Sequence, residues 1–237
     1  MTADTVTYGA ARAEQERLCS LLDPGIGEPQ LLAWRYSEPA IVLGRSQRAT
    51  SGLLQRASEA GVEVVARTGG GGAVLAGPWM ASVSLLLPGT HDWARASLPA
   101  SYRMVGEACR RALLDLSVVT SLANGRRALA PHPDLEWACF AEVSHGELLV
   151  NGKRKIVGLC QTRRRDVVVV SIGVLLTRPD WSTLVRLWHG QDEPELAQRL
   201  EECTACCDEF SPGSTGAIIE SLVGAVQAAL PSARLAA

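Results

Sequence analysis

The chain has 237 residues, of which 47% are hydrophobic and 20% charged, a composition typical of an ordinary globular protein with a core of its own. Its 23 basic and 25 acidic residues give a formal net charge of −2, so the overall charge indicates neither a nucleic-acid partner nor a membrane partner. Without a membrane-length apolar run or a secretory signal pattern, we expect a cytoplasmic protein whose seven cysteines are free thiols.

Helices and strands are predicted to alternate unevenly along the chain. In the first half we expect helices at 9–22, 51–60 and 98–116, and strands at 31–36, 40–43, 62–65 and 81–87. Further on we expect a loop at 124–133, two or three strands between 147 and 176, and mainly helices after 179. Because this order has no regular βαβ period, it favours an α+β (mixed α/β) fold over a doubly wound parallel sheet.

A lysine in an apolar segment is the most informative single residue. Lys155 directly precedes the branched pair Ile156 and Val157, with Gly152 and Gly158 on either side. A cation in such a run needs an anionic or polar partner, since its burial otherwise costs free energy. The alternative is an Asn-Gly hairpin tip with the lysines in water, and the segment taken alone favours that alternative.

A run of four glycines follows the strand predicted at 62–65. Consecutive glycines let backbone N–H groups converge on an anion, and Arg67 just before them can add a charge-assisted contact. The run is not a P-loop, because no Gly-Lys-Ser/Thr follows it. The alternative is a flexible hairpin loop, but four glycines are costly in backbone entropy, which favours a binding role.

Two weaker patterns involve a strand end and a thiol. Arg45 and Gln47 follow the strand at 40–43, where a polar pair can face a ligand or stand in a solvated loop. Cys139 precedes the Lys155 segment, and a thiol beside an ammonium group can act as a nucleophile. A buried, inert cysteine is the alternative, and His145 in the same region is expected to lie on the surface.

A cluster of three cysteines near the C-terminus has the start of a zinc-site spacing. Cys203, Cys206 and Cys207 lack a second closely spaced pair, so we expect them on the apolar face of a helix and predict no metal site.

Three motifs, taken in order, resemble those of the lipoate–protein ligase A/octanoyltransferase superfamily, which also includes the biotin–protein ligase catalytic domain. They are Pro-Ala-Ile-Val-Leu-Gly-Arg-Ser-Gln at 39–47, Arg-Thr-Gly-Gly-Gly-Gly-Ala-Val-Leu at 67–75 and Gly-Lys-Arg-Lys-Ile-Val-Gly-Leu-Cys-Gln at 152–161. The resemblance covers about 31–177. It implies a single catalytic domain over 1–237 with a helical C-terminal part from about 178, and a central mixed, largely antiparallel sheet flanked by helices.

The resemblance also implies an activity and a site. Enzymes of this kind attach an octanoyl or lipoyl group to the lysine of a lipoyl carrier domain, of the 2-oxoacid dehydrogenase E2 or glycine cleavage H protein type. In the transferase branch the acyl group, taken from a donor such as acyl carrier protein, passes through a cysteine thioester, which makes Lys155 and Cys139 the predicted catalytic residues. The acyl or adenylate group is expected to contact the following residues: Arg45, Gln47, Arg67, Gly69, Gly70, Gly71, Gly72, Ala73, Val74 and Gly158.

Two other functions remain open from the sequence. One is an ATP- and Mg-dependent lipoate–protein ligase in which Cys139 is structural. The other is a diverged, non-catalytic protein that binds a lipoyl-type ligand, because Pro78-Trp79 stands where many members have His-Asp after the glycine motif. We expect no tightly bound cofactor in the transferase, with lipoate or octanoate as substrate, and ATP and Mg only in the ligase.

Overall fold

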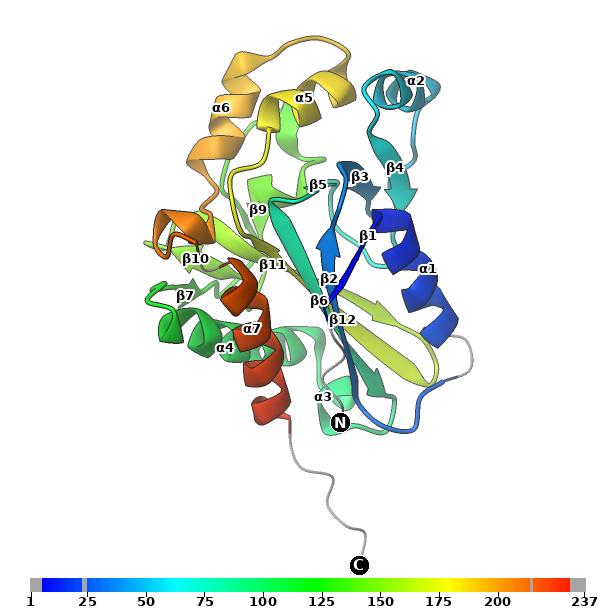
Figure 1. Cartoon of the computed structure of the whole chain (residues 1–237), viewed down its shortest axis with the longest axis vertical. Coiled ribbons are helices and arrows are strands. Elements are labelled where there is room, and N and C mark those ends of the chain that lie inside the picture. Colours follow the sequence, from blue (N-terminus) through cyan, green and yellow to red (C-terminus); the bar gives the residue numbers. More distant parts are fainter. Residues whose placement is uncertain (1–5, 23–24, 214, 231–237) are drawn as a thin grey trace, which may run out of the picture.

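The computed structural model describes residues 6–22, 25–213 and 215–230, and its main feature is a seven-stranded sheet (Figure 1). The strand order is β1-β2-β6-β12-β11-β10-β7, and all neighbours are antiparallel except β1 and β2. The strands are β1 (Thr7–Gly9), β2 (Gln30–Tyr36), β6 (Met80–Pro88), β7 (Ser121–Leu122), β10 (Leu148–Val150), β11 (Arg154–Arg163) and β12 (Val167–Leu175).

Two smaller sheets stand beside this one. The first has the order β4-β3-β5 and consists of β3 (Ala40–Leu43), β4 (Glu63–Ala66) and β5 (Val74–Ala76). The second pairs β8 (Arg127–Ala128) with β9 (Glu142–Val143). The four glycines connect β4 to β5, so they join one edge strand of the three-stranded sheet to the other.

Seven helices cover the sheets in the part of the chain that the structure describes. They are α1 (Ala11–Leu22), α2 (Ser51–Glu59), α3 (Asp92–Arg95), α4 (Leu98–Asp115), α5 (Trp181–His189), α6 (Pro194–Glu202) and α7 (Thr215–Ala229). Local sequence sets several of their ends: Thr50, Ser97 and Asp180 accept N-cap hydrogen bonds, and Gly190 ends α5 in the left-handed conformation with φ of 84°.

The two faces of the large sheet bury different cores. α4 and α7 pack together on one face, against residues such as Val83, Leu85, Val170 and Ile172. The opposite face meets α1, the small sheet and the α5–α6 segment through a second core (Figure 1). It is this second face that carries the candidate site. No helix in the described residues is long and apolar enough to span a membrane.

The predicted fold class is confirmed: the sheet is mixed, largely antiparallel and flanked by helices. The helices and strands predicted up to 116 and the three strands of the 147–176 region are present within a few residues of their expected ends. β1, β5, β7, β8, β9 and the single-turn helix α3 were not predicted, because each has only two to four residues and little periodicity to detect. Of these, β8 lies within the segment predicted as a loop at 124–133. All seven cysteines are free, as expected.

Candidate functional site

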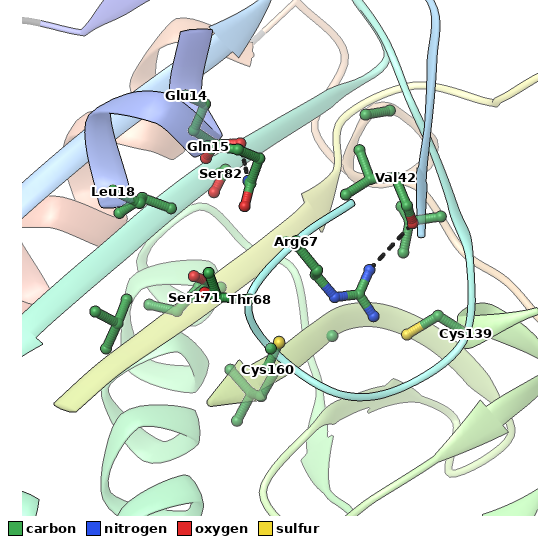
Figure 2. A pocket seen from close by; sticks show the side chains of 18 of the residues that line it. Glu14, Gln15, Leu18, Val42, Arg67, Thr68, Ser82, Cys139, Cys160 and Ser171 are labelled. Atoms are coloured by element: carbon green, nitrogen blue, oxygen red, sulfur yellow. Dashed lines mark hydrogen bonds between the residues drawn. The ribbon is translucent and has the colours of Figure 1, made fainter. Parts of the chain in front are cut away.

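An elongated cavity lies between α1 and the second face of the large sheet (Figure 2). It encloses about 740 Å³ of space not filled by atoms, its open mouth included. Small side chains on three neighbouring strands make the room for it: Ser82 of β6, Ser171 and Gly173 of β12, and Gly158, Cys160 and Thr162 of β11. Leu18, Val74, Met80, Phe140 and Val169 supply apolar walls. The shape and lining suit a flexible, mostly apolar chain.

Lys155 is buried beside this cavity, with 1% of its surface exposed. Its Nζ lies 2.9 Å from Oε2 of Glu147 and donates hydrogen bonds to the carbonyl oxygens of Cys139 and Glu142, each at 3.0 Å. The Cys139 Sγ is 3.9 Å from the same nitrogen. The ammonium group is thus fully engaged by three oxygen partners, with the thiol as a fourth neighbour.

Glu147 is the anionic partner that a lysine in an apolar strand requires. Its side chain is 3% exposed, Oε1 accepts from the backbone N–H of Leu159 at 2.9 Å, and Oε2 accepts from that of Ser144 at 2.7 Å. Burial lowers the pKa of Lys155, but the charges of Cys139 and Glu147 and the Glu147 contact outweigh it and raise the pKa above its usual value. Lys155 is therefore a permanent cation at neutral pH.

A β-bulge determines which way Lys155 points. Leu148 of β10 pairs with Val157, whereas the next residue, Leu149, pairs with Lys155, so Ile156 is an extra residue in β11. Val157 packs into the α4–α7 core. Strict alternation would send Lys155 to that same apolar face, and the bulge turns it instead to the cavity side.

A segment from the C-terminal part holds the backbone of Lys155 in place. The Lys155 N–H donates to the carbonyl of Cys203 at 2.8 Å, and the Lys155 carbonyl accepts from Ala205 at 2.9 Å. Next to it, Arg154 donates to the Thr204 carbonyl at 2.7 Å and pairs with Glu209 at 2.8 Å. The position of the lysine thus depends on contacts between residues about 50 apart in sequence.

The glycine run is joined to the loop that carries Cys139. Ala73 donates to the Trp137 carbonyl at 2.7 Å, and the Cys139 N–H donates to the Ala73 carbonyl at 2.9 Å. Gly72 makes this approach possible, because a Cβ there would collide with the Trp137 carbonyl and come within 2.7 Å of the Cys139 nitrogen. The glycines therefore serve here to bring two loops together at the thiol.

Arg67 is the cation that lines the cavity between Cys139 and the α1 side (Figure 2). Its guanidinium donates to three backbone carbonyls, of Gly70 and Gly72 at 2.8 Å and of Val42 at 3.3 Å. Within the described residues it forms no ion pair with a carboxylate. It braces the glycine loop and leaves an uncompensated positive charge at the cavity.

The predicted site residues fall into three groups. Cys139, Arg67, Gly69, Val74 and Gly158 line the cavity, and Lys155 lies directly behind Gly158. Gly72 and Ala73 make the junction with the Cys139 loop, as described above.

The third group lies away from the cavity lining. Arg45 has an exposed side chain, and Gly70 and Gly71 are exposed as well. Gln47 links two loops, since its Oε1 accepts from Gly44 and its Nε2 donates to the Trp137 carbonyl, both at 2.9 Å. His145 is exposed, as expected.

Sequence reasoning missed several residues of the site. Glu147 and Cys160 are among them, although a buried lysine calls for a carboxylate nearby and Cys160 stands inside the lysine motif. Glu14 was missed too, yet it shares the buried face of α1 with Ala11, Leu18 and Leu22, and an acidic residue on such a face is a signal.

The prediction that Cys203, Cys206 and Cys207 lie on the apolar face of a helix is wrong. α6 ends at Glu202, Cys203 caps it, and the following residues extend alongside Lys155, so the cysteines do not share a helix face. Cys203 and Cys206 belong to one core and Cys207 to the other. Across the residues that the structure describes, no group of three metal-ligating side chains is found.

Comparison with known proteins gives both sequence and structural matches. Over 163 residues the chain is 32% identical to octanoyltransferase LipM of Exiguobacterium sp., a match that covers 66% of this chain and 58% of that protein. The chain therefore spans little more than half the length of this curated relative.

Two solved structures share the fold. The bipartite lipoate protein ligase of Thermoplasma acidophilum, studied with its E2 lipoyl domain, matches with a TM-score of 0.70 and 16% identity, over 95% of this chain and 81% of that one. A lipoate–protein ligase A bound with ATP matches with a TM-score of 0.68 and 17% identity, over 95% and 83% of the two chains. At these identities the likeness is one of fold.

One protein family matches most of the chain in sequence. The lipoyl protein ligase A/B catalytic domain matches residues 7–203, a span that contains the cavity, Cys139 and Lys155. The resemblance seen in the three sequence motifs is thereby confirmed, and the chain belongs to the lipoyl protein ligase A/B catalytic domain family.

Proposed function

We propose that this protein transfers an octanoyl or lipoyl group to the lysine of a lipoyl carrier domain through a thioester on Cys139. The observation that carries the proposal is the position of one thiol: Cys139 lines a mostly apolar cavity and lies 3.9 Å from the buried ammonium of Lys155. The sequence similarity to an octanoyltransferase supports transfer over ATP-dependent ligation.

The first half of the reaction would load the enzyme. The Cys139 thiolate attacks the carbonyl carbon of an acyl thioester on a donor such as acyl carrier protein. A new carbon–sulfur bond forms, the donor's carbon–sulfur bond breaks, and the donor thiolate takes up a proton. Nearby cations would stabilise the negative charge on the attacking sulfur and on the carbonyl oxygen. We assign this role to Lys155, whose Nζ is 3.9 Å from the Cys139 Sγ, and to Arg67, which lines the same cavity as Cys139.

The second half would unload it. The carrier lysine, as a neutral amine, attacks the Cys139 thioester, an amide bond forms, Cys139 leaves as thiolate and the amine loses a proton. Both half-reactions exchange one acyl bond for another and need no nucleotide. The carrier would be of the E2 or glycine cleavage H protein type, in keeping with the E2 lipoyl domain that accompanies the T. acidophilum ligase.

Lys155 would act mainly through its fixed charge. Its Nζ already has the Glu147 carboxylate and two backbone carbonyls as hydrogen-bond partners, so a direct bond to the acyl oxygen would have to replace one of the carbonyls. Because one of those carbonyls belongs to Cys139 itself, the same contact fixes the loop that presents the thiol. We therefore assign Lys155 both a positioning and an electrostatic role.

The test is intact-mass analysis after mixing the protein with an octanoylated acyl carrier protein. We expect one added acyl group, removed by neutral hydroxylamine, absent in Cys139→Ala and retained in Cys160→Ser. The second variant is the matched control, since Cys160 lines the same cavity. A parallel reaction with lipoate, ATP and Mg tests the ligase: acylation of a lipoyl domain that survives Cys139→Ala would overturn the proposal.

A further inference from the structure

The end of the cavity away from Cys139 is polar, which an apolar chain does not require. Figure 2 shows Glu14, Gln15 and Ser82 on the opposite side of Arg67 from Cys139. The Glu14 residue is 2% exposed, and its Oε2 accepts hydrogen bonds from the Tyr36 hydroxyl at 2.7 Å and from the Gln15 amide at 3.2 Å. We call these four residues the polar corner.

The polar corner contains a buried carboxyl group without a cationic partner. Among the described residues no Lys, Arg or His forms an ion pair with Glu14, whereas Glu147 at the other end is paired with Lys155. Burial raises the pKa of Glu14 above its usual value, only partly offset by hydrogen bonds from Ser82, Tyr36 and Gln15. A carboxyl group in such a setting favours its neutral form, which can donate as well as accept a hydrogen bond.

Packing alone does not account for the polar corner. α1 lies on the sheet through Ala11, Leu18 and Leu22, and an apolar residue at position 14 would continue that stripe. Burying a carboxyl group and a phenol instead costs free energy that their mutual hydrogen bonds return only in part. Gln15 lines the cavity too, and its one hydrogen bond among the described residues does not use all the donors and acceptors of its amide group.

We propose that the polar corner is a subsite for the far end of the acyl chain, and that the substrate carries an oxygen or sulfur function there instead of a plain methyl end. The inference rests on the proposed acyl transfer, whose carbonyl end lies at Cys139. It specifies the substrate class: a medium-length acyl group ending in a hydroxyl, carbonyl or disulfide function. The apolar walls between the two ends bind the methylene chain.

The test compares three neutral ligands by calorimetry on Cys139→Ser protein, in which no thioester forms: octanamide, 8-hydroxyoctanamide and lipoamide. We expect the two polar-ended amides to bind about fivefold more tightly than octanamide, the equivalent of one net hydrogen bond. Comparing the affinity of 8-hydroxyoctanamide with that of lipoamide shows whether the subsite prefers oxygen or sulfur. Glu14→Leu should abolish the difference while octanamide binding persists, and Glu16→Leu, at an exposed position of the same helix, should preserve it.

The outcomes separate this inference from the proposed function. Equal binding of all three amides, or a preference that survives Glu14→Leu, overturns the subsite and leaves acyl transfer standing. Failure of every amide to bind, together with no thioester on the native protein, overturns both. Should Glu14→Leu fail to fold, Tyr36→Phe removes the hydroxyl that holds Glu14 and is expected to reduce the same preference.

Discussion

Lys155 and Glu147 form an ion pair that is closed off from water, with Nζ and Oε2 2.9 Å apart and side-chain exposures of 1% and 3%. The carboxylate is further fixed by two backbone N–H groups, and the ammonium by two backbone carbonyls. Such complete satisfaction is what allows both charges to stay in the interior, and it makes each residue dependent on the other.

Breaking this pair from either side should destabilise the protein strongly. Lys155→Met and Glu147→Gln are each expected to lower the free energy of unfolding by about 3–5 kcal/mol, because each leaves a buried group without its partner. The double variant should lose clearly less than the sum of the two. Urea denaturation of the four proteins measures this coupling, and strictly additive losses would contradict the pairing.

The ion pair should also leave a signature at alkaline pH. Since the folded-state pKa of Lys155 is raised, the stability it contributes is complete below the unfolded value of about 10.4 and is lost as pH rises through the folded value. The difference in unfolding free energy between native protein and Lys155→Met should therefore be constant from neutral pH to about 10 and shrink above it. A difference that instead grows as pH rises towards about 10 would show that the lysine pKa is lowered.

The junction between the glycine run and the Cys139 loop can be tested with two matched alanine substitutions. Gly72→Ala places a Cβ against the Trp137 carbonyl and the Cys139 nitrogen, whereas nothing lies within 4 Å of a Cβ at Gly70. A displacement of about 1 Å at the thiol can cost on the order of 100-fold in rate. We expect a loss of that size in thioester formation for Gly72→Ala, and near-native rates for Gly70→Ala. Equal rates would show that the junction does not position Cys139.

The buried carboxyl group of the polar corner predicts an effect at mildly acidic pH. With a folded-state pKa raised above 4.5, Glu14 favours folding fully only below that value, and its contribution falls as pH rises from 4.5 to the folded value. Tyr36, Gln15 and Ser82 face it, so no nearby cation reverses the sign. Glu14→Gln should gain stability relative to native protein across this window, by at most about 1.4 kcal/mol per pH unit. The matched control is Glu16→Gln, at an exposed position of the same helix.

The sequence was sufficient for the fold class because long, strongly patterned segments carried it. The run of four valines that opens β12 and the 18-residue helix α4 each specify their element locally. The family motifs added the site region, and the Asn151-Gly152 turn formed as the hairpin alternative expected, with φ of 50° and 67°.

The setting of Lys155 could not be derived in the same way. The hairpin alternative placed the lysines in water, which holds for the exposed Lys153 and fails for Lys155. Two features make the difference: the bulge in β11, and the carboxylate of Glu147 in the connection between β9 and β10. Both arise from long-range pairing that no local pattern encodes. Similarly, Arg45 and Gln47 follow a strand end as expected, yet the tertiary structure leaves one exposed and uses the other to hold two loops together.

The contacts between Lys155 and residues 203–205 have a consequence for how the protein is synthesised. When β11 has just emerged from the ribosome, Lys155 is present, but residues 203–205, which hydrogen-bond to its backbone, have not yet been synthesised. The site can be completed only after α5 and α6 have followed, so chains interrupted before residue 203 would carry both the thiol and the lysine without the finished site. If the proposed acyl transfer holds, acylation of Cys139 would begin only on chains synthesised beyond that point.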